Sequence, residues 1–217
     1  MICPLCQSES GLFNQDKKRH YYQCRQCYFV FVDASEFISK DEEGRRYETH
    51  NNSADDPRYV DYLTNVRDSF LEMGIPGEKG VDIGSGSSTL LADLFAQKKY
   101  DVLSYDPQFH PDTNWKNSNY DFFTLSEVIE HLHHPIEVLS SLRDLLHSGG
   151  KILIKTEFIP PKEKREFNLW YYKNDDTHVH FYTESSAREL SRRLGMGIEF
   201  SHSLRGVFSL VRKKSEI

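Results

Sequence analysis

The sequence predicts an α/β protein with a doubly wound, mostly parallel sheet and a small cysteine-rich module at its N-terminus. Two observations lead to this prediction. From residue 57 onward, segments with strand-like and helix-like periodicity alternate, an order that favours parallel strands with helices on both faces. All four cysteines lie ahead of these segments, within the first 27 residues. We therefore expect a cysteine module at 1–32, a linker at 33–56 and an α/β domain at 57–217.

Composition limits the class of protein. A chain of 217 residues can form one α/β domain with an appendage, and 38% hydrophobic residues are enough for a core. No apolar run approaches the roughly 20 residues that a membrane span needs, and no signal-peptide core is present, so we expect a cytoplasmic protein with no membrane partner. The net charge of -6 argues against an extended nucleic-acid footprint, because clustered Lys and Arg neutralise phosphates.

The cysteines form two pairs, Cys3-x-x-Cys6 and Cys24-x-x-Cys27, separated by 17 residues. Under reducing conditions such a set binds a metal rather than forming disulfides. Four thiolates around one ion suit Zn²⁺ in a closed structural site. The sequence therefore predicts a zinc ribbon with all four cysteines as ligands, and zinc must supply most of the folding free energy of so small a module. We expect its core to be separate from that of the α/β domain.

The α/β domain begins with a predicted amphipathic helix from Pro57 to near Gly74, preceded by a cap at Asp55-Asp56. A strand at 80–83 follows and leads through a Gly/Ser loop into a helix whose buried face carries Leu90 and Leu94. The remaining elements are predicted from periodicity and turn residues, and they are strands at 101–105, 120–126 and 151–156, helices at 136–146 and 185–194, and a terminal hairpin of 198–203 and 207–212.

The Gly/Ser loop has the composition of a cofactor loop. Its sequence is Val81-Asp82-Ile83-Gly84-Ser85-Gly86-Ser87-Ser88-Thr89, and glycines allow the backbone to approach a ligand closely. The next strand ends in Tyr105-Asp106-Pro107, which places a carboxylate 24 residues after Asp82, suitable for binding ribose hydroxyls. An ordinary strand–helix connection and a dinucleotide oxidoreductase are the alternatives to this interpretation.

These residues resemble the class I methyltransferases that depend on S-adenosylmethionine (SAM). In that family an acidic residue precedes Gly-x-Gly-x-Gly, and the second strand ends in an acidic residue. The resemblance covers about 57–212, and it includes 120–132, which is similar to the fourth strand and its Glu-His segment, and 145–154, which is similar to the next turn and strand. It implies a seven-stranded sheet, SAM as cofactor and methyl transfer as the reaction, and it favours these over an oxidoreductase.

The resemblance also implies the residues of the cofactor site. Gly84 and Gly86 would pass beside the methionine part of SAM, Asp82 would lie beneath the loop, and Asp106 would bind the ribose. The full implied set is Asp82, Gly84, Ser85, Gly86, Asp106, Pro107 and Glu127. The sequence departs from the family in two places. Ser88 replaces the third glycine, and only 13 residues separate Asp106 from Tyr120, so the third strand is compressed or missing and 114–119 must contact the adenine.

Methyl transfer requires a nucleophile aligned with the methyl group and, for a poor nucleophile, a base. The candidates are His131, His178 and His180, and a structural role is the alternative for each. The resemblance places His178 over the methyl group, so it is the preferred base, with His180 on the same side of an extended segment. His131 is expected to orient the loop around SAM. Another alternative is that Asp176 binds a metal together with His178 and His180.

Two further features bear on the acceptor. Trp170, Tyr171 and Tyr172 are candidates for an aromatic wall around it. The overall acidity favours a small-molecule acceptor over RNA. A four-cysteine module beside a SAM domain is similar to zinc-ribbon rRNA methyltransferases and to zinc-containing sugar C-methyltransferases. The alternative function is a zinc-ribbon module that binds RNA or protein and has little catalytic activity. Its binding patch would be Lys17, Lys18, Arg19, Tyr21 and Tyr22.

Overall fold

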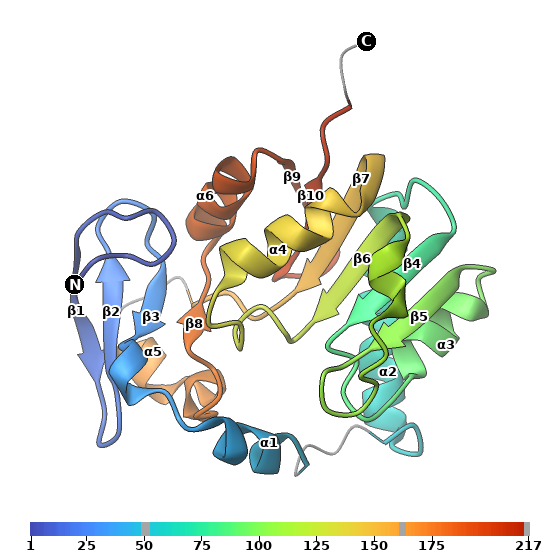
Figure 1. Ribbon diagram of the computed structural model, residues 1–217. Coiled ribbons are helices and arrows are strands. Elements are labelled where there is room, and N and C mark those ends of the chain that lie inside the picture. Colours follow the sequence, from blue (N-terminus) through green and yellow to red (C-terminus); the bar gives the residue numbers. More distant parts are fainter. Residues whose placement is uncertain (49–52, 161–163, 215–217) are drawn as a thin grey trace.

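The computed structural model of the protein describes residues 1–48, 53–160 and 164–214. Two sheets lie side by side, a small one built mainly from the N-terminal residues and a larger one flanked by helices (Figure 1). Within the described ranges, no helix has the length and apolar character needed to cross a membrane.

The larger sheet has the strand order β5-β4-β6-β7-β10-β9. Its strands are β4 (Lys79–Ile83), β5 (Asp101–Tyr105), β6 (Tyr120–Ser126), β7 (Leu146–Lys155), β9 (Gly197–Phe200) and β10 (Val207–Val211). The first four strands in this order pair in parallel, and β10 pairs antiparallel with both β7 and β9. The mostly parallel sheet and the terminal hairpin are therefore confirmed.

The prediction of seven strands is wrong, because this sheet has six among the described residues. The missing strand is the third one of the family pattern. Between β5 and β6 the chain forms an isolated bridge between Asp106 and His110 and then a short 3-10 helix, η2 (Asn114–Asn117). The connection is too short to hold a further strand together with the turns that would be needed to place it beside β5.

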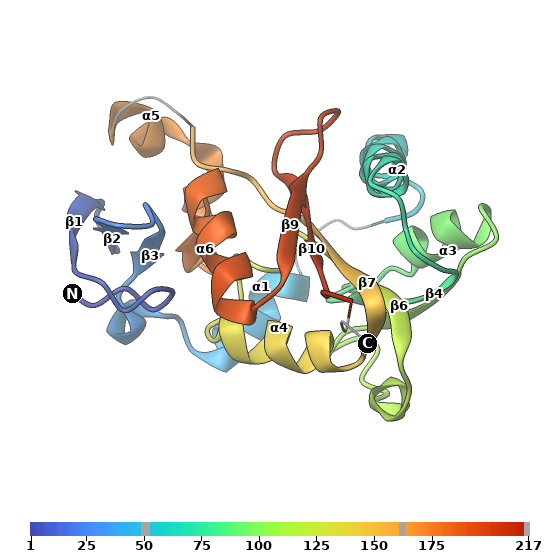
Figure 2. The same ribbon diagram turned by 90° about the horizontal axis from the view of Figure 1, so that it is seen from above.

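Helices cover both faces of the larger sheet, as Figure 2 shows from above. On one face α2 (Pro57–Glu72) and α3 (Leu90–Ala96) form a buried cluster with side chains such as Phe122 and Leu153. On the other face α4 (Pro135–Asp144) and α6 (Glu184–Leu194) cover Phe123 and Ile152. Neighbouring residues of one strand point to opposite faces. The doubly wound architecture follows from this alternation.

The smaller sheet joins the two ends of the chain. Its order is β1 (Ser10–Gln15), β2 (His20–Cys24), β3 (Val30–Val32) and β8 (His180–Phe181). β8 follows β7 in the chain, yet it pairs antiparallel with β3, and Figure 1 shows it between the two sheets. Cys3, Cys24 and Phe29 belong to the same buried cluster as residues of the larger sheet. The expectation of a separate ribbon core is therefore wrong.

The segment predicted as a linker contains two short helices. They are η1 (Ala34–Glu36) and α1 (Lys40–Glu48), and residues 49–52 of the predicted linker lie outside the described residues. In Figure 1, α1 runs below the gap between the two sheets. This position lets α1 contribute side chains to the cavity described below.

Arg19 fixes the hairpin tip of the small sheet to the segment after β7. That segment holds α5 (Lys164–Leu169) and η3 (Tyr171–Asn174). Arg19 is only 4% exposed, and its guanidinium donates to the carbonyl oxygens of His178 at 2.9 Å, of Asp176 at 3.3 Å and of Lys173. Charged donors to buried carbonyls form strong hydrogen bonds. Arg19 therefore supports the backbone that carries His178.

We predict that Arg19→Met lowers the free energy of unfolding by about 2–4 kcal/mol, because three carbonyl groups lose a charged donor in a buried place. Thermal unfolding would show this as a fall of roughly 4–12 °C in Tm for a chain of this size. Lys18→Met is the matched control. Lys18 bonds to Asp176 at 2.5 Å with a side chain that is 68% exposed, and exposed ion pairs contribute little. Equal shifts for the two variants would contradict the structural role of Arg19.

Candidate functional site

A cavity of about 900 Å³ lies at the carboxyl ends of the parallel strands. This size is typical of sites for cofactors and small ligands. The loops after β4, β5 and β6 form one side of the cavity, and α1, α2 and the segment 171–178 form the other. Ligands of doubly wound sheets bind at this edge. Nine of the ten predicted cofactor and catalytic residues line the cavity, and they are Asp82, Gly84, Ser85, Gly86, Asp106, Pro107, Glu127, His131 and His178.

The loop between β4 and α3 depends on its two glycines. Gly84 and Gly86 have φ angles of 72° and 65°, in the left-handed region that favours glycine. A Cβ on Gly84 would lie 2.6 Å from a methyl carbon of Val128, so a larger residue would displace the turn after β6. The Gly84 N–H donates to the Tyr105 carbonyl at 2.7 Å. These constraints keep the loop backbone close against the cavity.

Asp82 lies beneath this loop, where the resemblance places it. Its side chain is 4% exposed, and the Thr124 hydroxyl donates to its Oδ1 at 2.7 Å. Burial raises the pKa of Asp82 to about 7, because the charged form is poorly solvated there. The carboxyl group is therefore a rigid part of the floor under the glycines.

Asp106, at the end of β5, is directly linked to the glycine loop. Its Oδ2 accepts the Gly86 N–H at 3.1 Å, and its Oδ1 accepts the N–H groups of Gln108 at 2.8 Å and Phe109 at 3.1 Å. A carboxylate offers about four acceptor positions, so two ribose hydroxyls still find acceptors here. The three backbone bonds fix the direction in which the carboxylate faces the cavity.

The predicted adenine segment, 114–119, contributes Trp115 and Lys116 to the cavity wall. Phe109 lines the same part of the cavity. Trp115 is 8% exposed, and its indole Nε1 has no hydrogen-bond partner among the described residues. Buried N–H donors are almost always paired in proteins. An acceptor atom of a bound ligand would satisfy this group.

Glu127 occupies a strained turn after β6. Its φ is 55°, a conformation that is uncommon for residues other than glycine. The carboxylate holds the turn in place by accepting from Tyr62 Oη at 2.9 Å, Lys155 Nζ at 2.9 Å and Tyr172 Oη at 2.8 Å. Strained residues of this kind persist where the surroundings determine their conformation, often at functional sites.

Glu130 is completely buried behind the cavity wall. The Thr156 hydroxyl donates to its Oε2 at 2.9 Å, and Tyr172 donates to its Oε1. Burial raises the pKa of Glu130 well above its usual value, and the nearby Glu127 charge adds to this effect. Within the predicted aromatic wall, Tyr171 and Tyr172 line the cavity, whereas Trp170 packs against Phe167 and Phe181.

Two of the three candidate histidines meet at the inner end of the cavity. The rings of His131 and His178 lie 4.5 Å apart at 74°. His178 Nδ1 is 2.7 Å from the Tyr172 carbonyl oxygen, and His131 Nδ1 is 3.2 Å from that of Thr177. Burial lowers the pKa of His178, so the neutral ring dominates near pH 7. A neutral imidazole can accept a proton or bind a metal.

His180 does not line the cavity. Its ring packs 5.0 Å from that of Phe29 in the small sheet, and burial lowers its pKa to about 3. The expectation that it shares a side with His178 is wrong, because the segment is not regularly extended. The His178 N–H bonds back to Asp175, and the N–H groups of Val179 and His180 both bond to the Glu130 carbonyl. The position of His180 fits a structural histidine.

Four cavity residues come from helices to which the sequence analysis gave no functional role. They are Arg46 and Tyr47 of α1 and Tyr59 and Tyr62 of α2. The tyrosines of α2 fit the apolar spacing of a helix, so the periodicity explains them fully as core residues. Their one additional signal is the hydroxyl group, which in Tyr62 bonds to Glu127. A polar tip on a buried aromatic residue usually finds a partner.

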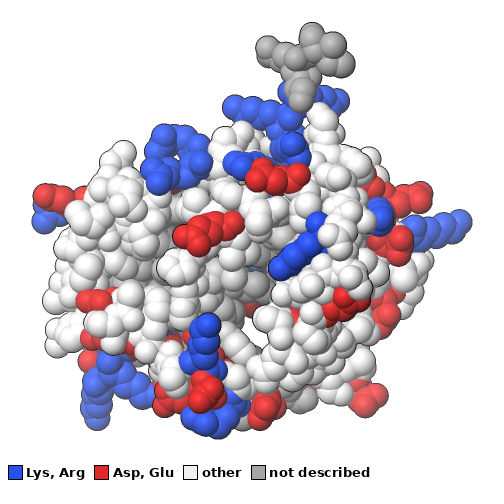
Figure 3. Space-filling model, in the orientation of Figure 1, with Lys and Arg blue, Asp and Glu red and all other residues white. Residues whose placement is uncertain are grey.

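The predicted nucleic-acid patch on the ribbon is not a continuous exposed surface. Arg19 is 4% exposed and Tyr21 is fully buried, so two of its five residues contribute no accessible surface. On the face of the molecule shown in Figure 3, Lys and Arg are interspersed with Asp and Glu. Neither feature provides the clustered positive charge that phosphate binding uses.

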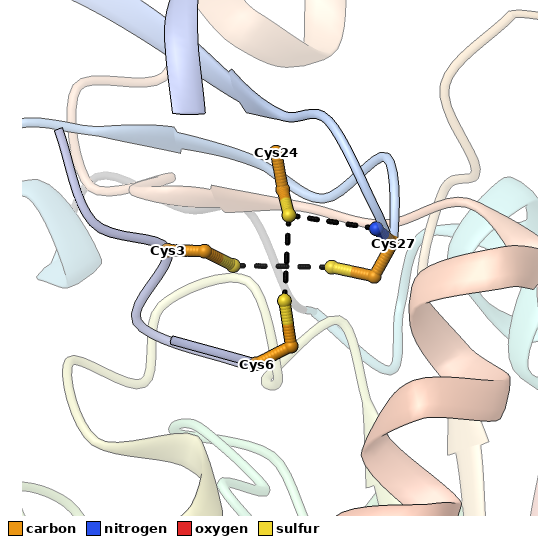
Figure 4. Close-up of side chains that lie close together, drawn as sticks. All are labelled: Cys3, Cys6, Cys24 and Cys27. Carbon is orange, nitrogen blue, oxygen red and sulfur yellow. Dashed lines mark hydrogen bonds between the residues drawn. The ribbon is translucent and has the colours of Figure 1, made fainter. Parts of the chain in front are cut away.

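The four cysteines form a compact cluster (Figure 4), with sulfur atoms 3.8 Å apart in Cys3 and Cys27 and 3.4 Å apart in Cys6 and Cys24. All four thiols are free of disulfides, and all four sulfurs lie within 4.8 Å of one another. The N–H groups of Gln26 and Cys27 point at the sulfur of Cys24, each at 3.4 Å. The predicted ligands are therefore together in space.

Solved structures similar to this chain are methyltransferases of low sequence identity. The plantazolicin methyltransferase BpumL, in complex with SAH, has a TM-score of 0.53 and 14% identity, over 81% of this chain and 92% of that one. TnmH has a TM-score of 0.55 and 13% identity, over 73% of this chain and 55% of that one. An O-methyltransferase family protein from Burkholderia thailandensis gives a TM-score of 0.46 and 19% identity, over 75% of this chain but only 62% of that protein.

The sequence itself also matches a known family. No curated protein matches it. A family model described as a methyltransferase domain matches residues 57–198, which is more than half of the chain and includes β4 to α6 with the glycine loop, Asp106 and the Glu-His segment. The chain therefore belongs to the methyltransferase domain family.

Proposed function

We propose that this protein transfers a methyl group from SAM to a small-molecule acceptor. The observation that carries the proposal is the joined geometry of two cofactor motifs, in which the Gly86 N–H bonds to the Asp106 carboxylate at the carboxyl ends of adjacent strands. A structural likeness to a methyltransferase in complex with SAH, the demethylated product of SAM, supports the same choice of cofactor.

The residues of the outer half of the cavity fit SAM. The loop at Gly84 and Gly86 would pass along its methionine part, and Asp106 would accept hydrogen bonds from its ribose hydroxyls. Phe109 and Trp115 would enclose the adenine, and the unpaired Nε1 of Trp115 would donate to it. When bound, SAM supplies a methyl group activated by a sulfonium. Our proposal for the protein is that it positions this group and the acceptor, and excludes water.

The inner half of the cavity suits a small acceptor with polar and aromatic groups. Tyr47, Tyr171 and Tyr172 line it together with His178. The earlier hypothesis that His178 is a base or orients the acceptor stays a prediction, and its place in this wall favours it. The net charge of -6 and the mixed charges in Figure 3 support a small molecule over RNA.

We also propose that the cysteine cluster holds one structural Zn²⁺. Zinc bonded to four sulfurs at about 2.3 Å places them about 3.8 Å apart in a tetrahedron, close to the spacings of the two cysteine pairs. N–H groups directed at a sulfur, as at Cys24, stabilise the thiolate that zinc requires. Because β3 pairs with β8, zinc would stabilise the cavity side as well as the ribbon.

Cofactor binding is tested by calorimetry with SAH. We expect binding, and we expect Asp106→Asn to weaken it about 10- to 100-fold, because the neutral amide loses charge-assisted bonds to the ribose. Asp101→Asn, at the exposed beginning of the same strand, is the control and should bind SAH normally. Absence of SAH binding to the folded wild type would overturn the proposed function. Unchanged affinity in Asp106→Asn would only reassign the ribose ligand.

The acceptor class is tested with methyl-labelled SAM. We expect label to pass into a mixture of small metabolites and not into RNA, because the enclosed cavity and mixed surface charge suit the former. The transfer is followed by separating small molecules from polymer after the reaction. Label found in RNA alone would contradict the small-molecule proposal while leaving methyl transfer intact.

Zinc is tested by elemental analysis after dialysis. We expect zinc to be retained by the wild type, and lost in Cys24→Ser together with a lower Tm for the whole chain, since the cysteines share a buried cluster with the larger sheet. His20→Asn, an exposed histidine of the same module, should keep its zinc. Full zinc retention in Cys24→Ser would contradict the assignment of the four cysteines.

A further inference from the structure

The inner end of the cavity holds a second cluster of metal-binding side chains, distinct from the cysteines. One ligand atom from each of Glu130, His131 and His178 lies within 4.8 Å of the others. They come from the turn after β6 and from the segment before β8, which are far apart in the sequence. The cofactor contacts proposed above use none of these three side chains.

Each member of the cluster is held from behind. The Nδ1 atoms of His178 and His131 face backbone carbonyls at 2.7 and 3.2 Å, so an Nδ1–H tautomer gives each Nε2 the lone pair. The Glu130 carboxylate is oriented by Thr156 and Tyr172. Histidines that bind metals characteristically donate their second N–H to a carbonyl or carboxylate. The cluster therefore has the supporting contacts of a metal site as well as its ligands.

The local charge also favours a cation. Tyr172 Oη donates to both Glu127 and Glu130, so two carboxylates lie on either side of one hydroxyl group. The ammonium of Lys155 bonds to Glu127 at 2.9 Å, but it also bonds to Glu157 at 2.7 Å. One lysine thus serves two carboxylates, while Glu130 is fully buried with neutral donors. A buried carboxylate is stabilised by a bound cation.

We propose that Glu130, His131 and His178 bind a divalent transition-metal ion, such as Mn²⁺ or Zn²⁺, at the inner end of the cavity. Two imidazoles and a carboxylate are ligands that such ions accept, and three protein ligands leave coordination positions open. An ion bonded at about 2.1 Å separates two donors by at most about 4.2 Å, so the side chains must close by a few tenths of an ångström. The alternative trio from the sequence does not assemble, because His180 packs on Phe29.

The site would give the acceptor a chemical class, an inference that rests on the proposed function. His131 and His178 line the cavity, so the open positions of the ion would face the bound acceptor. An oxygen atom of the acceptor, as in a hydroxyl group, would bind there and lose its proton more easily. His178 would then orient the acceptor through the ion and would not itself remove the proton.

The proposal is tested with Mn²⁺ and the full zinc-loaded chain, without SAM. Electron paramagnetic resonance follows the loss of the free Mn²⁺ signal, and Mn²⁺ does not compete well for a four-thiolate site. We expect one equivalent to bind, with affinity at least tenfold lower in His131→Asn, His178→Asn and Glu130→Gln. His134→Asn, an exposed histidine on the same loop, should bind Mn²⁺ like the wild type.

Zinc content and circular dichroism confirm that each variant is folded. His178 and Glu130 are buried, so the half-buried His131 provides the decisive variant if the other two do not fold. Two results would overturn the site: a folded wild type that binds neither Mn²⁺ nor a second Zn²⁺, or a folded His131→Asn that binds Mn²⁺ as tightly as the wild type. Because SAM is absent, both results are independent of whether the protein binds SAH.

Discussion

The burial of Glu130 is the constraint on which the arrangement of the site depends. Its carboxylate accepts from Thr156, which follows β7, and from Tyr172 of η3. Its backbone carbonyl accepts the N–H groups of Val179 and His180 at 3.0 and 3.1 Å, where β8 begins. One residue after β6 therefore fixes three later segments, and a fully buried carboxyl group is tolerated only with such complete pairing.

The small sheet is part of the same construction. β8 is both the fourth strand of that sheet and the continuation of the segment that carries His178. Arg19 holds this segment from the ribbon side through backbone carbonyls. The cysteine module thus bears on the cavity through the backbone, although its own metal ligands lie away from it. This explains physically how a ribbon can influence a site to which it contributes no cavity-lining side chain.

Local patterns predicted most of the larger sheet and the outer half of the site. Alternation located the strands, and the spacing of Gly84, Gly86 and Asp106 predicted residues that the structure brings together. The contributions of Tyr47 and Tyr172 could not be predicted in this way, because they depend on contacts between segments far apart in the chain. His180 was misplaced because two residues of separation define a shared side only in a regular strand. The seventh strand came from the family pattern and not from this chain's own short connection.

That short connection has a consequence for the rim of the sheet. Without a third strand, β5 is the outermost strand on its side among the described residues, and Leu103 on it is 46% exposed. Unpaired backbone groups on an outer strand are a template for association with other chains, and proteins limit this hazard with short strands and charged residues. β5 has only five residues and begins with Asp101. Its brevity and charge therefore act as protection against aggregation where the usual covering strand is absent.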